Sequence, residues 1–203
     1  AKARNVEVLQ GRGVFESDHT LKVGDHVVEF EHCIIAVGSS PVRLPFLPKD
    51  DPRIWDSTDA LELREIPAHV TILGGGIIGL EMAEVYHRLG SKVTVVEMAG
   101  QIIPGADSDL VRPLYKQISG EYEGVYLNTT VTAVDAAGKS LVITLDGNDA
   151  PKTLEADVLL SAVGRKSNAG TLNLEAAGIT VNDQGIIQVD EFLRTSTPHI
   201  FAV

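Results

Sequence analysis

The residues best suited to chemistry are a glycine-rich run and one acid downstream of it. Gly74-Gly75-Gly76-Ile77-Ile78-Gly79 fits the pattern G-x-G-x-x-G, and Glu97 lies 18 residues after Gly79. Between a strand and a helix, this pattern binds a dinucleotide, because glycines permit a tight turn that aims backbone N–H groups at the pyrophosphate. An acid at this distance accepts hydrogen bonds from ribose hydroxyls. We therefore predict a dinucleotide site formed by the run and Glu97.

Glu97 also indicates which dinucleotide to expect. A carboxylate repels the additional 2′-phosphate of NADP, whose binding requires cationic side chains. The residues that follow, Met98 to Gln101, include no Lys or Arg. We therefore expect NAD as the cofactor. The alternatives are a glycine turn used only for packing and a solvated acid at a strand end.

Glu81 is a second acid of interest. It follows the glycines closely, and we place it in the first turn of the predicted helix, where the helix dipole stabilises a carboxylate. Complementation of the dipole alone explains it equally well.

The elements around the motif have the order strand, helix, strand, helix, strand. Apolar runs typical of buried strands alternate with segments of helical periodicity. This order predicts an α/β fold, namely a doubly wound Rossmann-like domain with a parallel sheet followed by a β-meander. The predicted strands are His69–Leu73, Lys92–Met98 and Val125–Leu127; the helices are Ile77–Leu89 and a second one capped by Asp107 or Ser108.

The first predicted helix should bury one apolar face against the sheet. Ile78, Met82, Val85 and Leu89 recur at spacings that place them on one side of a helix. Gly90 then occupies the position that commonly follows a helix C-terminus.

Two meanders in the sequence each lead into a buried run. Ala36-Val37-Gly38 ends the first run, and Ala162-Val163-Gly164 ends the second, which indicates a repeat. Only the second copy is preceded by a complete strand-helix-strand unit, so we expect the chain to begin and stop inside a domain. Residues 41–67 are predicted to be a surface connection with one helical turn, Ser57–Leu63, capped by Asp56 or Ser57.

Composition excludes several classes of function. The chain has 28 acidic and 17 basic residues and a net charge of −11, so it should repel nucleic acid. No apolar run approaches the roughly 20 residues of a membrane span. The single cysteine, Cys33, cannot form an internal disulfide, which favours the cytoplasm, and we assign it to the core. The six histidines are dispersed in the sequence, so we expect no metal site.

The chain resembles the dihydrolipoamide dehydrogenases of bacteria, within the pyridine nucleotide-disulfide oxidoreductases. The resemblance extends over essentially all 203 residues, and the stretch Pro52–Leu61 is its most specific part, because nucleotide binding does not require that stretch. The segments that carry it are Ile35–Ser39, Asp51–Leu61, Gly74–Glu81, Val85–Gly90, Val95–Glu97, Leu193–Thr195 and Pro198–Ala202.

The resemblance implies a homodimeric FAD enzyme. Such an enzyme oxidises protein-bound dihydrolipoamide, held on the dihydrolipoyl domains of 2-oxoacid dehydrogenase complexes, and reduces NAD⁺ through a disulfide and flavin. Residues 65–187 would be the NAD domain. Residues 1–64 and 188–203 would be two partial segments of the FAD domain.

The resemblance also assigns roles to single residues. Ile77 corresponds to a residue beside the nicotinamide pocket, and Glu81 to a glutamate near the flavin that pairs with a lysine. Val131 corresponds to a contact on the adenine side, and Gly164 to a backbone contact with NAD. The strand end Val37-Gly38-Ser39 corresponds to one that touches FAD.

Several parts of the family pattern do not occur in these residues. They include the G-x-G-x-x-G that binds FAD, the Cys-x-x-x-x-Cys redox pair, the Gly-Asp that binds FAD and the dimerisation domain with its His/Glu pair. We therefore expect the fragment alone to be inactive, with no catalytic residue of its own. A non-catalytic NAD-binding redox sensor remains an alternative, as does an NAD-linked sister flavoprotein such as a transhydrogenase, an NADH oxidase or a mercuric reductase.

Overall fold

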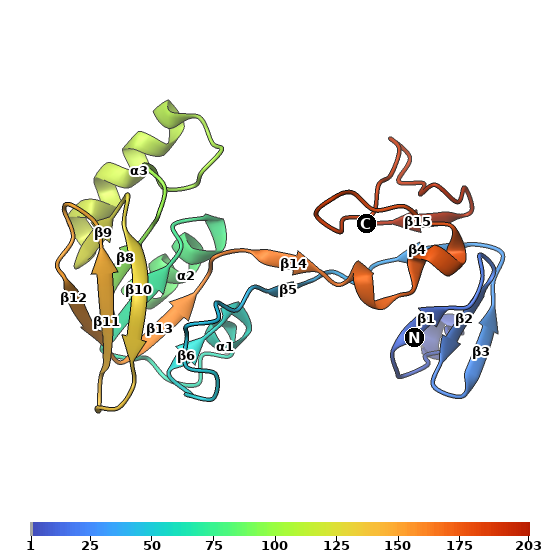
Figure 1. The fold of residues 1–203 in the computed structure, drawn as a ribbon, viewed down its shortest axis with the longest axis horizontal. Coiled ribbons are helices and arrows are strands. Elements are labelled where there is room, and N and C mark those ends of the chain that lie inside the picture. Colours follow the sequence, from blue (N-terminus) through green and yellow to red (C-terminus); the bar gives the residue numbers. More distant parts are fainter. Residues whose placement is uncertain (1) are drawn as a thin grey trace. The chain divides into compact units, whose positions relative to one another are not determined.

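The computed structural model describes residues 2–203, which form two compact units. The central unit is Pro41–Gly164. The split unit combines the residues up to Ser40 with Arg165–Val203. Figure 1 shows that two extended segments, one on each side of the central unit in the sequence, connect the two.

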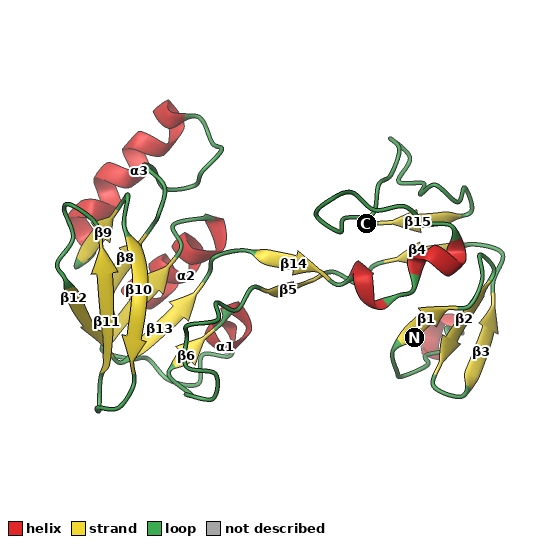
Figure 2. Ribbon diagram, in the orientation of Figure 1, coloured by secondary structure: helices red, strands yellow, loops and turns green. Residues whose placement is uncertain are grey.

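The central unit is built on a five-stranded sheet in which every pair of neighbouring strands is parallel. Helices connect its first four strands in chain order, as parallel neighbours require a crossover, and a meander leads to the fifth. The predicted doubly wound class is confirmed (Figure 2). In spatial order the strands are β6 (Ile54–Trp55), β13 (Val158–Ser161), β7 (His69–Leu73), β8 (Lys92–Val96) and β9 (Gly124–Tyr126); the helices are α1 (Ser57–Leu61), α2 (Ile77–Arg88) and α3 (Ser108–Glu121).

Both faces of this sheet are covered. Successive side chains of a strand point to opposite sides, so one strand contributes to two hydrophobic clusters. Val70 and Ile72 of β7 pack in the cluster that contains the helices. Leu73 instead packs with Val96 of β8 against the second meander. This antiparallel meander consists of β10 (Thr130–Asp135), β11 (Leu141–Asp146) and β12 (Thr153–Ala156).

The buried face of α2 differs from the predicted one. Only Met82 of the four predicted residues is buried, while Val85 and Leu89 are 37% and 44% exposed. The prediction failed because apolar residues occur all round this helix, so spacing alone could not select a face. The true face is set by small residues that permit close packing and by Tyr86, whose hydroxyl donates to the Ala60 carbonyl at 2.7 Å. It consists of Gly79, Leu80, Met82, Ala83 and Tyr86.

The segment before β7 is an integral part of the central unit, which corrects its prediction as a surface connection. Trp55 is buried in the same core as Tyr86, and β6 extends the sheet beside β13. Asp56 caps α1 as predicted, because its side chain accepts the N–H groups of Thr58 and Asp59. Arg53 pairs with Asp51 and donates to carbonyl groups of the β10–β11 turn, which ties this segment to the meander.

The split unit contains three small sheets. Its core surrounds Phe15, Ile35 and Ile200, against which Leu172 and Ile179 of the C-terminal part pack. Its strands are β1 (Gly13–Phe15), β2 (Thr20–Val23) and β3 (His26–Glu29), antiparallel; β4 (Cys33–Ile35) with β15 (Ile200–Ala202), parallel; and β5 (Ser39–Pro41) with β14 (Arg165–Ser167). Its 3-10 helices are η1 (Lys2–Arg4), η2 (Ala169–Thr171) and η3 (Leu174–Ala177).

The chain passes between the two compact units at 40/41 and 164/165. The expected limits at 64/65 and 187/188 are those of an NAD domain and an FAD domain, and they stay a prediction. Residues 41–64 lie in the central unit because Trp55 and Ala60 belong to its core, and residues 165–187 lie in the split unit because Leu172 packs on Phe15. The cofactor that each unit binds remains a prediction.

Candidate dinucleotide site

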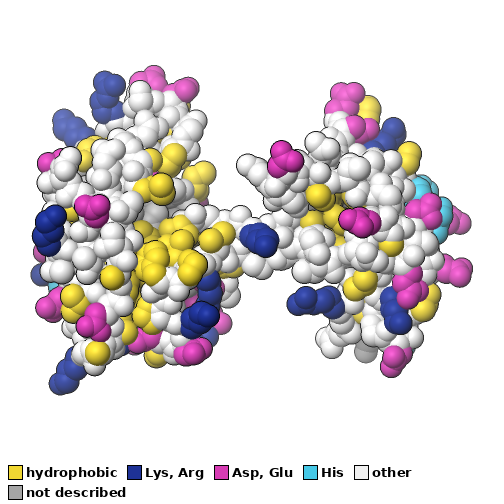
Figure 3. Space-filling model, in the orientation of Figure 1, with side chains coloured by type: hydrophobic (Ala, Val, Ile, Leu, Met, Phe, Trp, Pro, Cys, Tyr) yellow, Lys and Arg dark blue, Asp and Glu magenta, His cyan; other side chains and the backbone are white. Residues whose placement is uncertain are grey.

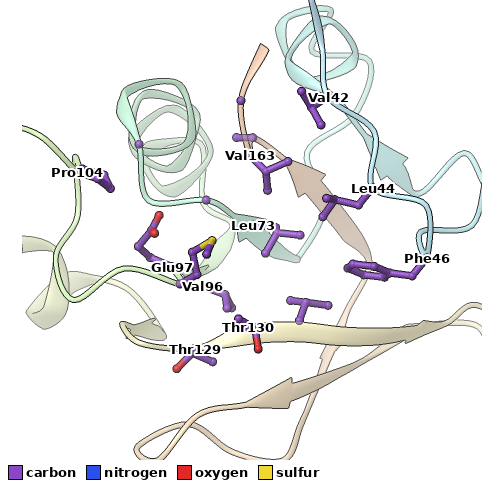
Figure 4. A pocket seen from close by; sticks show the side chains of 16 residues that line it. Val42, Leu44, Phe46, Leu73, Val96, Glu97, Pro104, Thr129, Thr130 and Val163 are labelled. Atoms are coloured by element: carbon purple, nitrogen blue, oxygen red, sulfur yellow. The ribbon is translucent and has the colours of Figure 1, made fainter. Parts of the chain in front are cut away.

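A cavity of about 490 Å³ lies at the carboxyl ends of β7, β8 and β13 in the central unit. In an open α/β sheet, this is the edge where ligands bind. In Figure 4, Leu73, Val96 and Glu97 lie at the ends of strands on one side of the cavity, and Leu44 and Phe46 lie on the other side. The residues that line the cavity are Val42, Leu44, Phe46, Leu73, Gly74, Gly76, Val96, Glu97, Met98, Pro104, Thr129, Thr130, Val131, Ala162, Val163 and Gly164.

Glu97 is held rigidly at the wall of this cavity. Its side chain is buried, and its two carboxylate oxygens accept the N–H groups of Gly75 at 2.6 Å and Ala99 at 2.7 Å. A carboxylate offers about four acceptor positions, so positions remain for two more donors. The carboxylate is therefore oriented by the glycine turn while it is still able to accept ribose hydroxyls.

The glycines divide into two kinds. Gly74 has φ +107°, and a Cβ there would lie 2.5 Å from the Ala162 carbonyl oxygen. A Cβ at Gly79 would overlap the Gly74 carbonyl oxygen, so the absence of that atom lets α2 approach the turn. A Cβ at Gly76 would meet nothing within 4 Å, although Gly76 lines the cavity. Gly74 and Gly79 thus serve packing, whereas the space beside Gly76 is open to a ligand.

The electrostatics of the cavity suit an NAD-type ligand. Among its lining residues Glu97 is the only charged one, and no Lys or Arg is present. The first N–H groups of α2 have no partners within the helix, and its N-terminus carries a positive partial charge. Such a helix N-terminus is suited to phosphate groups, and the cavity lining offers no cation to a 2′-phosphate.

The structure brings some predicted residues together at this site and separates others. Gly74, Gly76, Glu97, Val131 and Gly164 all line the cavity. Gly75 is buried behind Glu97 and acts through its N–H group.

The α2 residues of the motif lie beside the cavity rather than in its wall. Ile77 begins α2 and is 63% exposed, and Ile78 follows it. Glu81 is exposed but is the fifth residue of α2, so its assignment to the first turn was wrong. Because the dipole effect falls off beyond the first turn, it does not explain Glu81.

Two groups of cavity residues were not predicted. Val42, Leu44 and Phe46 form one wall, although we interpreted their segment as a surface connection. Their alternation with other residues was the available signal, since it is typical of a strand-like segment with one buried side. Thr129 and Thr130 enter the wall with Val131 at the start of β10, and no sequence motif marks them.

The residues predicted to touch FAD lie in the split unit. Val37 and Gly38 line a hollow of about 290 Å³ together with Leu193 and Val203. The Ser39 hydroxyl accepts a hydrogen bond from the Arg165 guanidinium at 2.7 Å. The structure thus assigns the predicted NAD residues and the predicted FAD residues to separate units.

Two further predictions concern Cys33 and the histidines. Cys33 is half-buried in β4, and burial raises the pKa of its thiol, which fits a core residue. The histidines were expected to form no metal site because they are dispersed in the sequence, but dispersal in the sequence does not prevent proximity in the fold. Asp18, His19 and His199 lie together in the split unit because β15 pairs with β4 next to the first hairpin.

The sheet topology, the glycine turn and the oriented acid give the central unit the architecture of an α/β dinucleotide-binding fold. The family model "Pyridine nucleotide-disulphide oxidoreductase" matches residues 1–203. The chain belongs to that family, whose members use FAD and a pyridine nucleotide.

Curated relatives agree with this assignment. The chain is 49% identical over 208 residues to "Dihydrolipoyl dehydrogenase" of Vibrio cholerae. The aligned region covers 100% of this chain and 44% of the relative. The chain is 47% identical to the protein of the same name from Haemophilus influenzae, covering 100% of this chain and 43% of the relative. The chain therefore spans less than half the length of these relatives.

Solved structures have the same fold. The HOCl-induced flavoprotein disulfide reductase RclA from Escherichia coli matches with a TM-score of 0.85 and 32% identity, over 98% of this chain and 45% of that one. The NAD-dependent persulfide reductase from A. fulgidus matches with a TM-score of 0.82 and 25% identity, over 99% of this chain and 39% of that one. No helix in residues 2–203 has the length and apolarity to span a membrane.

Proposed function

We propose that the central unit binds NAD and that the chain is the NAD-binding portion of an FAD-dependent dihydrolipoamide dehydrogenase. The observation that carries the first part is the buried Glu97 carboxylate, anchored on the Gly75 N–H at 2.6 Å beside the open Gly76 position. Glu97 accepts the ribose hydroxyls, and the N-terminal turn of α2 binds the pyrophosphate. Val131 packs on the adenine side, Gly164 contacts the cofactor through its backbone, and Ile77 lies at the nicotinamide end.

The split unit contributes the strand end Val37-Gly38-Ser39 to FAD. Bound FAD would carry electrons between a dithiol and the nicotinamide. The redox-active disulfide of such an enzyme requires two cysteines, and these 203 residues contain one, Cys33. The whole enzyme would oxidise the dihydrolipoyl domains of 2-oxoacid dehydrogenase complexes as a cytoplasmic homodimer. The 47–49% identity to dihydrolipoyl dehydrogenases favours this substrate over those of other flavoprotein reductases.

Two assays test the two parts of the proposal separately. The 203-residue chain, titrated with NADH, should bind it, retain no stoichiometric flavin and show no lipoamide turnover. FAD retained through purification would contradict the assignment of the split unit as an incomplete FAD site.

The second assay uses the full coding region with its flanking sequences. That protein should reduce NAD⁺ with dihydrolipoamide as the electron donor, and Glu97→Gln should raise the KM for NAD⁺. Turnover with a persulfide or another disulfide substrate, and none with dihydrolipoamide, would indicate a sister flavoprotein. NADH binding without any redox turnover would indicate a sensing module.

A further inference from the structure

Three metal-ligand side chains from opposite ends of the chain meet on the split unit. Asp18 and His19 lie in the turn between β1 and β2, and His199 immediately precedes β15. One ring nitrogen of each histidine and a carboxylate oxygen of Asp18 lie within 4.8 Å of one another. The two imidazole rings are stacked, with centroids 4.1 Å apart and planes 7° from parallel. Figure 3 shows histidine side chains next to acidic ones on this unit.

Each imidazole is oriented by a backbone carbonyl. His19 Nδ1 lies 2.9 Å from the Phe30 carbonyl oxygen, and His199 Nε2 lies 2.7 Å from the Asp18 carbonyl oxygen. A carbonyl oxygen only accepts, so both of these nitrogens must carry hydrogen. In the neutral rings the other nitrogens, Nε2 of His19 and Nδ1 of His199, therefore hold free lone pairs. A ring fixed by one nitrogen with the other unprotonated is the usual arrangement of a metal-binding histidine.

The acidic groups around the rings favour a cation. The Asp18 carboxylate is exposed and has no hydrogen-bond partner in the part of the chain that the structure describes. Glu29 and Glu31 line an open hollow together with His19. These three acids create a negative potential at the two imidazoles, which attracts a divalent ion.

We propose that Asp18, His19 and His199 bind a divalent transition metal ion such as Zn²⁺. Imidazole nitrogens with a carboxylate oxygen suit Zn²⁺, and three protein ligands leave a fourth position for water. Bonds of about 2.0–2.2 Å to the metal imply ligand atoms roughly 3.3 Å apart in a tetrahedral site. Because an imidazole lone pair lies in the plane of its ring and the two rings are nearly parallel, one ring must rotate for both nitrogens to point at the same ion.

The bound ion would connect the first hairpin to the strand β15, which is far from it in sequence. The site is independent of the dinucleotide cavity, because every ligand belongs to the split unit. Metal binding should therefore raise the thermal stability of the split unit and leave the affinity for NADH unchanged.

The test is a calorimetric titration of the untagged 203-residue chain with Zn²⁺. We expect one ion per chain, with the affinity reduced at least tenfold in His19→Gln and in Asp18→Asn. His26→Gln is the matched control, because His26 is an exposed histidine at the start of β3, in the same three-stranded sheet but outside the cluster. Its affinity should equal that of the wild type.

A second readout uses Co²⁺ in place of Zn²⁺, with visible absorption reporting nitrogen and oxygen coordination. The Co²⁺ bands should appear in the wild type and in His26→Gln and should be absent from His19→Gln. If His19→Gln fails to fold by circular dichroism, Asp18→Asn still decides the result, because its side chain is exposed. Absence of saturable binding, or affinity unchanged in Asp18→Asn, or equal loss in His26→Gln, would overturn the proposal.

Discussion

Alanine at Gly76 should separate NAD binding from folding. A Cβ there meets no atom within 4 Å, and φ of −76° is accessible to alanine. The free energy of unfolding should therefore change by less than about 1 kcal/mol, because the restriction of the unfolded chain by alanine is offset by the preference for glycine at the N-cap of α2. The new methyl group, however, occupies the approach of the pyrophosphate to the first N–H groups of α2. Loss of one charge-assisted hydrogen bond costs about 1.5–3 kcal/mol, which corresponds to roughly 10- to 150-fold weaker NADH binding.

Gly79→Ala is the matched control, because the same change at this position should damage the fold. Its Cβ overlaps the Gly74 carbonyl oxygen, so α2 must move from the turn, at a cost of about 1–3 kcal/mol. Urea unfolding measures stability, and a fluorescence titration measures NADH affinity for both variants. A folded Gly76→Ala protein with wild-type affinity for NADH would show that the pyrophosphate does not approach Gly76, and equal destabilisation by the two substitutions would contradict the different packing of the two glycines.

Three further predictions concern the cofactor preference, the core and the thiol. Glu97→Gln combined with Met98→Arg should raise the ratio of NADPH to NADH affinity at least tenfold, because repulsion is removed and a cation is added at an exposed cavity residue; an unchanged ratio in paired titrations would count against the site. Tyr86→Phe should lower the free energy of unfolding by about 0.5–1.5 kcal/mol, because it removes this buried hydrogen bond and leaves the Ala60 carbonyl with the longer bond from the Leu63 N–H at 3.4 Å; no measurable loss in urea would show that this bond is dispensable. Burial raises the pKa of Cys33, so less thiolate forms at a given pH. Its alkylation at pH 8 should be slower in the folded chain than in urea and should accelerate as the pH rises, and equal rates would contradict a core position.

The strands and the acid of the dinucleotide site were predictable because their signals are local. His69–Leu73 and Lys92–Val96 are short apolar runs next to turn residues, and the structure places strands there. Glu97 directly follows the second of these, so its position relative to the glycines follows from the strand and helix lengths. Local patterns of this kind survive in the fold because the core requires them.

Other features depend on tertiary contacts that no local pattern records. The buried face of α2 is decided by Trp55 and Ala60, which belong to a segment we assigned to the surface. The wall formed by Leu44 and Phe46 exists because that segment folds back over the strand ends. The Asp18, His19 and His199 cluster depends on the pairing of β15 with β4, which joins residues that are far apart in the sequence.

An NMR titration of the isotopically labelled 203-residue chain with NADH tests most directly whether this cavity binds NAD. We expect the largest amide shifts at Gly75, Gly76 and Ile77, with further changes at Glu97 and Val131, and a weaker response in Glu97→Gln. An absence of saturable shifts, or shifts confined to the split unit, would contradict the assignment of this cavity as the NAD site.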